Sequence, residues 1–296
     1  MDLPRQFGPY RLLRRLGHGG MAEVFLAVAH GASGFEKRVA LKVLLPELQG
    51  DGEYERILID EATRAAGFSH RNLVGVHDLG CVDGSYFVRM DWVDGADLAA
   101  ILKDAPLAPN LALLVAEELA HALAYLHALT DDAGRALGLV HRDVSPSNVL
   151  ISRAGDVKLG DFGIAKATLL ADATRGGVRK GKYAYMSPEQ VTGSSLTSAS
   201  DQFALGITLH EALTGRRPYD ADTALETMER VRACAPLDLS ALDTDLASII
   251  ARCLARAPRD RFAEMGALAR TLSTARRTRA PASFEDLGRV ASRAAR

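Results

Sequence analysis

At the centre of the chain stands His141-Arg142-Asp143-Val144-Ser145-Pro146-Ser147-Asn148-Val149-Leu150, a compact polar turn between apolar flanks. Val140 and residues 149–151 predict short buried strands, so the polar residues would lie on a loop held at both ends by the core. An aspartate five residues before an asparagine is a pattern suited to catalysis. Because Asp, Ser, Pro and Asn also form ordinary turns, this stretch alone leaves both interpretations open.

The composition is that of a globular protein with one large or two moderate domains: 296 residues, 48% hydrophobic and 25% charged. A formal net charge of −1 argues against nucleic acid or an anionic membrane as the main partner. No stretch approaches the roughly 18 apolar residues of a membrane span, and the N-terminus does not resemble a secretion signal. We therefore expect a cytoplasmic protein without a membrane span.

Three widely spaced cysteines are too few and too scattered for a disulfide framework or a zinc site. They predict reduced thiols, and we expect each to be a small core residue: Cys81, Cys234 and Cys253.

The region from residue 10 to about residue 90 is rich in predicted strands. A glycine-rich turn contains Gly17 and Gly19 and leads into the β-rich residues 24–28. These glycines therefore belong to a hairpin, whereas a dinucleotide-binding motif would open a helix. Because glycines have no side chain, the backbone of this turn could close over phosphate groups.

A single lysine, Lys42, interrupts the apolar strand predicted at residues 38–44. A buried, unpaired ammonium group is costly, so Lys42 should face a cleft and hold an anion. Residues 51–68 predict a helix, and Glu61 on it is the candidate partner. Without the lysine, Glu61 would be interpreted as a solvated helix charge.

Beyond residue 90 the pattern becomes helical. Residues 86–95 begin as a strand and break at Gly95, as expected for a connector between lobes. A strand at residues 157–160 ends in Asp161-Phe162-Gly163. Helices are predicted at 98–102, 111–126, 201–214, 225–234, 246–255 and 262–274.

The motifs of this chain and their order along it resemble those of the protein kinase superfamily, most closely the bacterial branch of eukaryotic-like Ser/Thr kinases. The resemblance covers residues 10–276 and rests on the glycine turn, Val39-Ala40-Leu41-Lys42, Glu61, His141-Arg142-Asp143 with Asn148, Asp161-Phe162-Gly163 and Ser187-Pro188-Glu189. It implies an α+β, bilobal fold: a small antiparallel β lobe with one helix and a larger, mainly helical lobe. The expected boundaries are about 10–90 for the small lobe, 91–94 for the hinge and 95–276 for the large lobe, followed by a basic tail at 277–296.

The resemblance also implies an ATP site. Gly17 and Gly19 would cover the phosphates, and Lys42, fixed by Glu61, would hold the α- and β-phosphates. The residues expected around the adenine and ribose are Leu16, Val24, Ala40, Met90, Asp91, Val93, Asp97 and Leu150.

For the chemical step, the resemblance implies that Asp143 accepts or orients the substrate hydroxyl. Asn148 and Asp161 would bind Mg²⁺, a hard cation that prefers amide and carboxylate oxygens. Two further matches are structural: Asp201 would anchor the catalytic loop, and an ion pair would join Glu189 to Arg261.

Three positions depart from the family pattern. Ala22 replaces the third loop glycine, Ser145 stands where Ser/Thr kinases usually have lysine, and Lys182 stands where they usually have threonine. We hypothesise that Lys182 supplies the charge that position 145 lacks; the alternative is a solvated loop lysine. The same departures weaken the distinction between Ser/Thr and Tyr specificity, and the remaining pattern favours Ser/Thr.

The segment before Ser187 predicts regulation by phosphorylation. Thr174, with Thr168 as second choice, is the expected autophosphorylation site, and Arg142 matches the arginine that pairs with such a phosphate in related kinases.

The predicted function is transfer of the γ-phosphoryl group of ATP, with Mg²⁺, to Ser/Thr hydroxyls of protein substrates, with self-association for autophosphorylation. One alternative is a pseudokinase that binds nucleotide as a signalling scaffold, which Ser145 and Ala22 favour and the intact Lys42 and Asp143 oppose. A second is a small-molecule phosphotransferase of related fold.

For the C-terminal tail, a solvated end is the favoured expectation. Phe284, Leu287 and Ala291 could form one face of a short helix docked on the protein body or on a partner.

Overall fold

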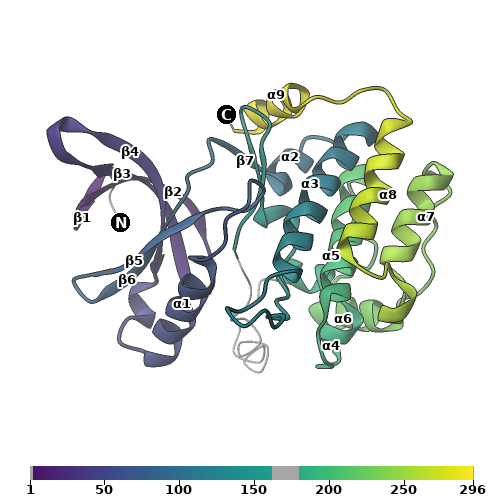
Figure 1. Ribbon diagram of the computed structural model, residues 1–296, viewed down its shortest axis with the longest axis horizontal. Coiled ribbons are helices and arrows are strands. Elements are labelled where there is room, and N and C mark those ends of the chain that lie inside the picture. Colours follow the sequence, from purple (N-terminus) through teal and green to yellow (C-terminus); the bar gives the residue numbers. More distant parts are fainter. Residues whose placement is uncertain (1–2, 162–179, 296) are drawn as a thin grey trace. The chain divides into compact units, whose positions relative to one another are not determined.

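The computed structural model describes residues 3–161 and 180–295. The chain divides into two compact units (Figure 1). Unit 1 comprises residues 3–69 and 74–92 of the described chain, and unit 2 comprises residues 70–73, 93–161 and 180–295.

Unit 1 is a six-stranded antiparallel sheet in the order β1-β2-β3-β4-β6-β5 with one α-helix among its described residues. Helix α1 begins after Asp51, whose side chain accepts a hydrogen bond from the Glu53 amide at 3.0 Å. The elements are β1 (Arg5–Phe7), β2 (Tyr10–His18), β3 (Ala22–His30), β4 (Glu36–Leu44), α1 (Gly52–Ala65), β5 (Val76–Val82), β6 (Ser85–Met90) and the short 3-10 helices η1 (Ala32–Gly34) and η2 (Pro46–Leu48).

The two faces of this sheet differ: one carries Lys42 and packs on α1, and the other is covered by an apolar cluster. Residues paired directly across neighbouring strands point to the same face. Val24 pairs with Lys42, and Ala40 pairs with Met90, so these four side chains share a face. On that face α1 packs through a cluster formed by Leu44, Leu58, Ala62 and Val88. The opposite face is covered by an apolar cluster that includes Phe7, Tyr10, Phe25, Leu41 and Phe87.

Unit 2 is mainly helical and carries a three-stranded antiparallel sheet in the order β7-β8-β9. The described α-helices are α2 (Leu98–Leu102), α3 (Pro109–His127), α4 (Pro188–Val191), α5 (Ser198–Thr214), α6 (Ala224–Ala233), α7 (Thr244–Cys253), α8 (Met265–Arg277) and α9 (Phe284–Ala294). The strands and 3-10 helices are β7 (Gly95–Asp97), β8 (Val149–Ser152), β9 (Val157–Leu159), η3 (Pro146–Asn148), η6 (Lys180–Tyr185) and η7 (Pro258–Asp260).

Helices α3 and α5 form the centre of unit 2, and each is buried along most of its length. Helix α5 ends at Gly215, whose φ of 71° is the left-handed conformation that closes many helices. The predicted fold class, a small antiparallel β unit with one helix and a larger helical unit, is confirmed.

Several local expectations were wrong. The sequence patterns do not reveal β1 and β5, because β1 has only three residues and β5 is an edge strand without a continuous buried face. Val140 is buried but lies outside any strand. The cysteines are free, as predicted, yet only Cys253 is a core residue; Cys81 lies exposed on the edge strand β5.

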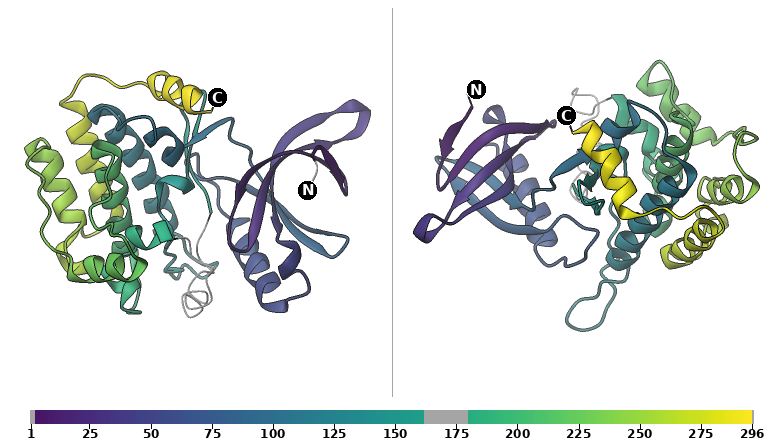
Figure 2. Two further views of the ribbon diagram at one scale, coloured as in Figure 1. Left: turned by 180° about the vertical axis from the view of Figure 1, so that it is seen from behind. Right: turned by 90° about the horizontal axis from the view of Figure 1, so that it is seen from above.

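The expectation of a solvated C-terminal end was also wrong. Residues 284–294 form α9, which contacts β7, β8 and α2 within unit 2 (Figure 2). Leu287 and Ala291 on this helix are fully buried. A capping box between Ser283 and Asp286 starts the helix.

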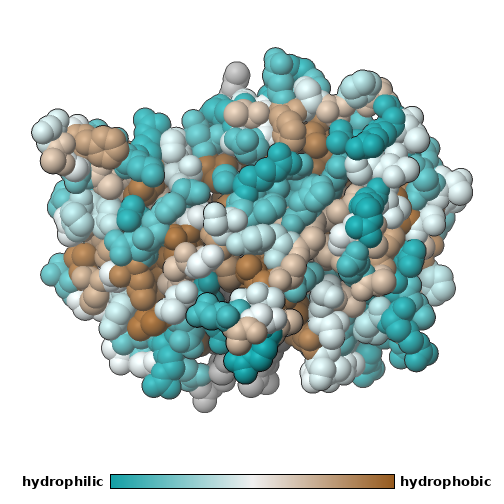
Figure 3. All heavy atoms as spheres, viewed as in Figure 1, coloured by the Kyte–Doolittle hydropathy of each residue, from teal (hydrophilic) through white to brown (hydrophobic). Residues whose placement is uncertain are grey.

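On the face drawn in Figure 3, apolar residues form separate groups among hydrophilic ones. Within the described ranges, no helix has the length and apolarity needed to cross a membrane.

Candidate active site

The lysine of unit 1 has the predicted partner. Lys42 Nζ donates a hydrogen bond to Glu61 Oε1 at 2.7 Å, and the exposed fraction of each side chain is small, 10% and 13%. Strand β4 directs Lys42 to the face that α1 covers, and α1 presents Glu61 to it. The ion pair holds the ammonium group in one position, as an anion-binding lysine requires.

The polar loop of unit 2 is anchored by a buried carboxylate. Asp201 on α5 is fully buried and accepts hydrogen bonds from the backbone amides of His141 at 2.8 Å and Arg142 at 2.9 Å. His127 Nε2 lies 2.8 Å from the same carboxylate. The predicted anchoring role of Asp201 is therefore confirmed.

Arg142 has an unusual backbone conformation that these contacts hold in place. Its φ of 69° lies in the left-handed region, which costs a non-glycine residue about 1 kcal/mol or more. Besides the bond to Asp201, Gln190 Nε2 donates to the Arg142 carbonyl at 3.0 Å. Gln190 was not predicted as part of the site; its place in a Ser-x-x-Gln capping box indicates a helix start but not this contact.

Asp143, Asn148 and Lys182 meet on one side of this loop. Lys182 Nζ donates to Asp143 Oδ2 at 2.7 Å, and Asn148 Nδ2 donates to the same oxygen at 2.9 Å. Asn148 Nδ2 also lies 2.7 Å from the Asp143 carbonyl oxygen. Residues 39 positions apart in the sequence thus place an ammonium group directly on the predicted catalytic carboxylate.

Ser145 cannot provide such a charge. Its side chain is buried, and its hydroxyl lies 3.2 Å from the hydroxyl of Ser147.

The segment that carries Lys182 is held against α5 and the residues after it. Tyr183 and Ala184 are buried, the Tyr185 hydroxyl donates to Glu211, and Arg217 donates to the Gly181 carbonyl at 3.3 Å. Burial and the neighbouring Glu211 carboxylate raise the pKa of the Tyr185 hydroxyl, and burial raises the pKa of Glu211. Tyr185 therefore stays a neutral donor, and Lys182 projects from a fixed backbone.

The predicted metal ligands are brought together by the backbone. The Gly160 amide donates to the Asn148 carbonyl at 2.9 Å, so Asp161 follows directly after a residue bonded to Asn148. The side-chain nitrogen of Asn148 donates its hydrogen bonds to Asp143. The side-chain oxygen of Asn148 therefore points away from Asp143. An amide oxygen and a carboxylate fit Mg²⁺, which is usually bound by one or two protein oxygens together with phosphates and water.

The predicted nucleotide residues fall on both units. On unit 1, Val24, Ala40 and Met90 share the face of Lys42. On unit 2, Asp97 of β7 pairs across the sheet with Leu150 of β8. The remaining predicted contacts are Leu16, Gly17, Gly19 and Asp91 in unit 1 and Val93 in unit 2. Thr168, Thr174 and residues 162–163 lie outside the described residues.

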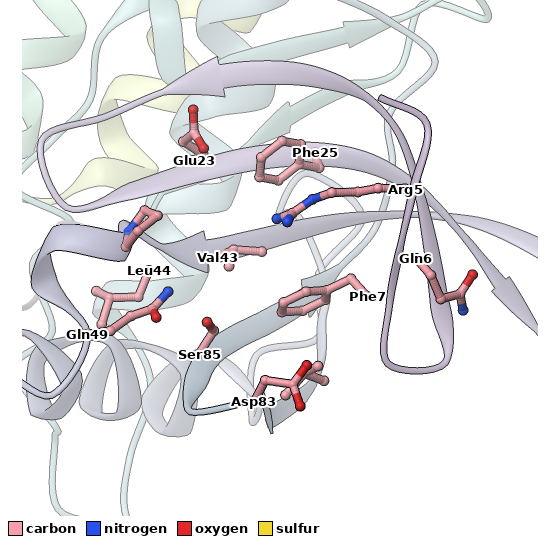
Figure 4. Close-up of a pocket in the computed structure, with 12 residues that line it drawn as sticks. Arg5, Gln6, Phe7, Glu23, Phe25, Val43, Leu44, Gln49, Asp83 and Ser85 are labelled. Atoms are coloured by element: carbon pink, nitrogen blue, oxygen red, sulfur yellow. The ribbon is translucent and has the colours of Figure 1, made fainter. Parts of the chain in front are cut away.

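A cavity of about 280 Å³ lies elsewhere in unit 1, among β1, β3, β4 and the β5–β6 turn. Figure 4 shows the Arg5 side chain directed between Phe25 and Val43. None of the predicted site residues lines this cavity, so it is not the predicted nucleotide site.

The glutamate and arginine predicted as scaffold do form a buried ion pair. Arg261 donates to both carboxylate oxygens of Glu189, at 2.6 and 3.0 Å.

Comparison with known proteins identifies the family. The model of the protein kinase domain matches residues 10–272. The chain is 39% identical to the tyrosine-protein kinase MasK of Myxococcus xanthus, over 93% of this chain and 44% of that protein. It is 37% identical to the serine/threonine-protein kinase PknD of Mycobacterium tuberculosis, over 89% of this chain and 39% of that protein.

Among solved structures, the kinase domain of PknI from M. tuberculosis superposes with a TM-score of 0.68 at 32% identity, covering 93% of this chain and 98% of that one. The chain belongs to the protein kinase family, and the resemblance seen in its motifs is confirmed. It spans less than half the length of these curated relatives.

Proposed function

We propose that this chain transfers the γ-phosphoryl group of ATP, with Mg²⁺, to serine and threonine hydroxyls of proteins, including its own. The observation that carries the proposal is the contact of Lys182 with Asp143, because it restores the positive charge that Ser145 lacks. The intact Lys42–Glu61 pair supports an active enzyme over a pseudokinase. Because ATP is the phosphoryl donor, we place the reaction in the cytoplasm.

In this proposal each residue has one task. The Asp143 carboxylate orients the substrate hydroxyl and accepts its proton as the hydroxyl oxygen bonds to the γ-phosphorus and the bond from that phosphorus to the departing ADP breaks. Lys182, which contacts Asp143, stabilises the negative charge of the transferring phosphoryl group. Lys42 holds the α- and β-phosphates in a position that Glu61 fixes.

When bound, Mg²⁺ would neutralise phosphate charge, with Asn148 and Asp161 as its protein ligands.

The direct test combines γ-labelled ATP, Mg²⁺, a generic protein substrate and the Asp143→Asn variant. We expect label on protein with the wild type and background label with the variant. Analysis of the phosphorylated amino acids should find phosphoserine or phosphothreonine. Phosphotyrosine alone would contradict the specificity, and nucleotide binding without transfer would establish the pseudokinase alternative.

Autophosphorylation gives a second prediction. After incubation with Mg²⁺-ATP, mass spectrometry should find phosphate on Thr174, with Thr168 as second choice. A phosphate adds close to two negative charges, and Arg142 is the residue expected to pair with it. Protein that phosphorylates a substrate while neither threonine carries phosphate would refute this prediction.

A further inference from the structure

Helix α9 lies against the small sheet of unit 2. It contacts β7, β8 and α2 (Figures 1 and 2). Leu287 and Ala291 on this helix are fully buried. The kinase domain match ends at residue 272, so α9 lies outside it.

Two glycines, Gly155 and Gly288, allow the backbone of α9 to approach the backbone of the β8–β9 turn closely. A Cβ on Gly288 would lie 2.3 Å from the Arg153 carbonyl oxygen, and a Cβ on Gly155 would lie 1.8 Å from the Phe284 carbonyl oxygen. Side-chain carbons do not approach backbone atoms this closely, so any larger residue at position 288 must push the helix away from the turn.

The turn beneath α9 is bonded to the start of β7. The Arg153 amide donates to the Asp94 carbonyl at 2.7 Å, and Arg153 Nε donates to the Asp94 carboxylate at 3.1 Å. The register of β7 and β8 then places Asp97 directly opposite Leu150, and both are predicted nucleotide contacts of this unit. Helix α9 therefore packs on the two strands that carry Asp97 and Leu150.

Strand β7 has few backbone contacts of its own within the small sheet. β7 has three residues and is an edge strand that pairs only with β8 in the described sheet. A short strand of this kind has few hydrogen bonds to fix its position.

We propose that α9 is a positioning element for the nucleotide site: by packing on β7 and β8 it holds Asp97 and Leu150 where ATP is bound. This inference rests on the proposed kinase function and adds an element outside the matched kinase domain. Displacement of α9 weakens nucleotide binding and leaves the catalytic loop, anchored separately by Asp201, in place.

The test compares Gly288→Val and the smaller change Gly288→Ala with Arg293→Ala, a control on the exposed side of the same helix. For each variant of the 296-residue chain, kcat and the KM for ATP are measured at saturating protein substrate, the Kd of Mg²⁺-ADP by calorimetry, and Tm by thermal unfolding. We expect Gly288→Val to raise KM and Kd at least fivefold with kcat within twofold of wild type. Gly288→Ala should change them in the same direction, and Arg293→Ala should change neither beyond twofold.

A lower Tm with unchanged KM and Kd would show that α9 adds stability only and would overturn the proposal. A parallel loss of kcat without a change in KM would overturn it as well. Wild-type protein that neither binds Mg²⁺-ADP nor transfers phosphate would instead refute the proposed function, on which the inference depends.

Discussion

Replacing Lys182 with alanine should lower kcat/KM for phosphoryl transfer by about three powers of ten. A lysine about 4 Å from a γ-phosphate oxygen contributes roughly 4 kcal/mol at an effective dielectric near 20, and each 1.36 kcal/mol is about a factor of ten in rate. The rate of phosphoryl transfer is affected because the lysine stabilises the charge on the phosphoryl oxygens in the transition state. Steady-state kinetics with a protein substrate measure it.

Two further variants make this test specific. Lys180→Ala removes the same charge two residues earlier and should leave kcat/KM within a few-fold of wild type. Ser145→Lys combined with Lys182→Thr moves the charge to its usual place in the family and should recover most of the activity. Near-wild-type activity of Lys182→Ala would mean that Lys182 is a structural or solvated lysine and would defeat the hypothesis.

Replacing Arg261 with alanine should destabilise the protein by about 3–5 kcal/mol, since it leaves the carboxylate of Glu189 buried without its cationic partner. The Arg261 side chain is fully buried, and its remaining hydrogen bonds go to the carbonyls of Ala255, Ala199 and Arg256. Its guanidinium also lies 4.9 Å from the centre of the Phe203 ring. Thermal unfolding should show a Tm lower by about 10 °C.

The neighbouring arginine provides the matched control. Arg259 is 89% exposed in a 3.9 Å pair with Asp260, so Arg259→Ala should change stability by less than about 0.5 kcal/mol. The double change Glu189→Met and Arg261→Met should cost less than Arg261→Ala, because no charge is left buried alone. Equal stability of Arg261→Ala and Arg259→Ala would show that the buried pair does not stabilise the fold.

The same pair predicts a pH dependence. Burial alone would raise the pKa of Glu189, but hydrogen bonds and charge from Arg261, with a hydrogen bond from Ser200, hold it below the ordinary value of 4.5. A depressed carboxyl pKa stabilises the folded state above the unfolded pKa, and this contribution is lost as pH falls through the folded pKa. Without Arg261, burial leaves the pKa of Glu189 raised. The stability difference between wild type and Arg261→Ala, measured by unfolding at a series of pH values, should therefore be full above that raised pKa and shrink as the pH falls toward the depressed pKa of the wild type.

Much of the site follows from residue types and local spacing. A lysine inside an apolar strand needs an anion, and the structure places Glu61 on it. Asp143 and Asn148, five residues apart on one loop, are joined by hydrogen bonds. The first relation is predictable because an unpaired buried charge is costly, and the second because a short loop keeps its residues close together.

Other features depend on contacts between distant parts of the chain. Neither β1 nor β5 has an apolar pattern of its own, since each is an edge strand whose pairing is set by a neighbour. Gln190 appears in the sequence as a helix cap, yet it also holds the Arg142 carbonyl.

Lys182 shows most clearly which features follow from the sequence and which depend on the tertiary structure. The sequence shows that lysine is present at position 182 and absent from position 145. It also suggests the hypothesis that Lys182 compensates for the missing lysine. That its ammonium group lies 2.7 Å from Asp143 depends on how Tyr183, Ala184 and Tyr185 pack in unit 2. Likewise, α9 is a predictable amphipathic helix, but its place on β7 and β8 depends on two glycines whose close contacts exist only in the folded chain. Local propensity determines which elements form, whereas steric fit and burial between distant segments determine where they lie.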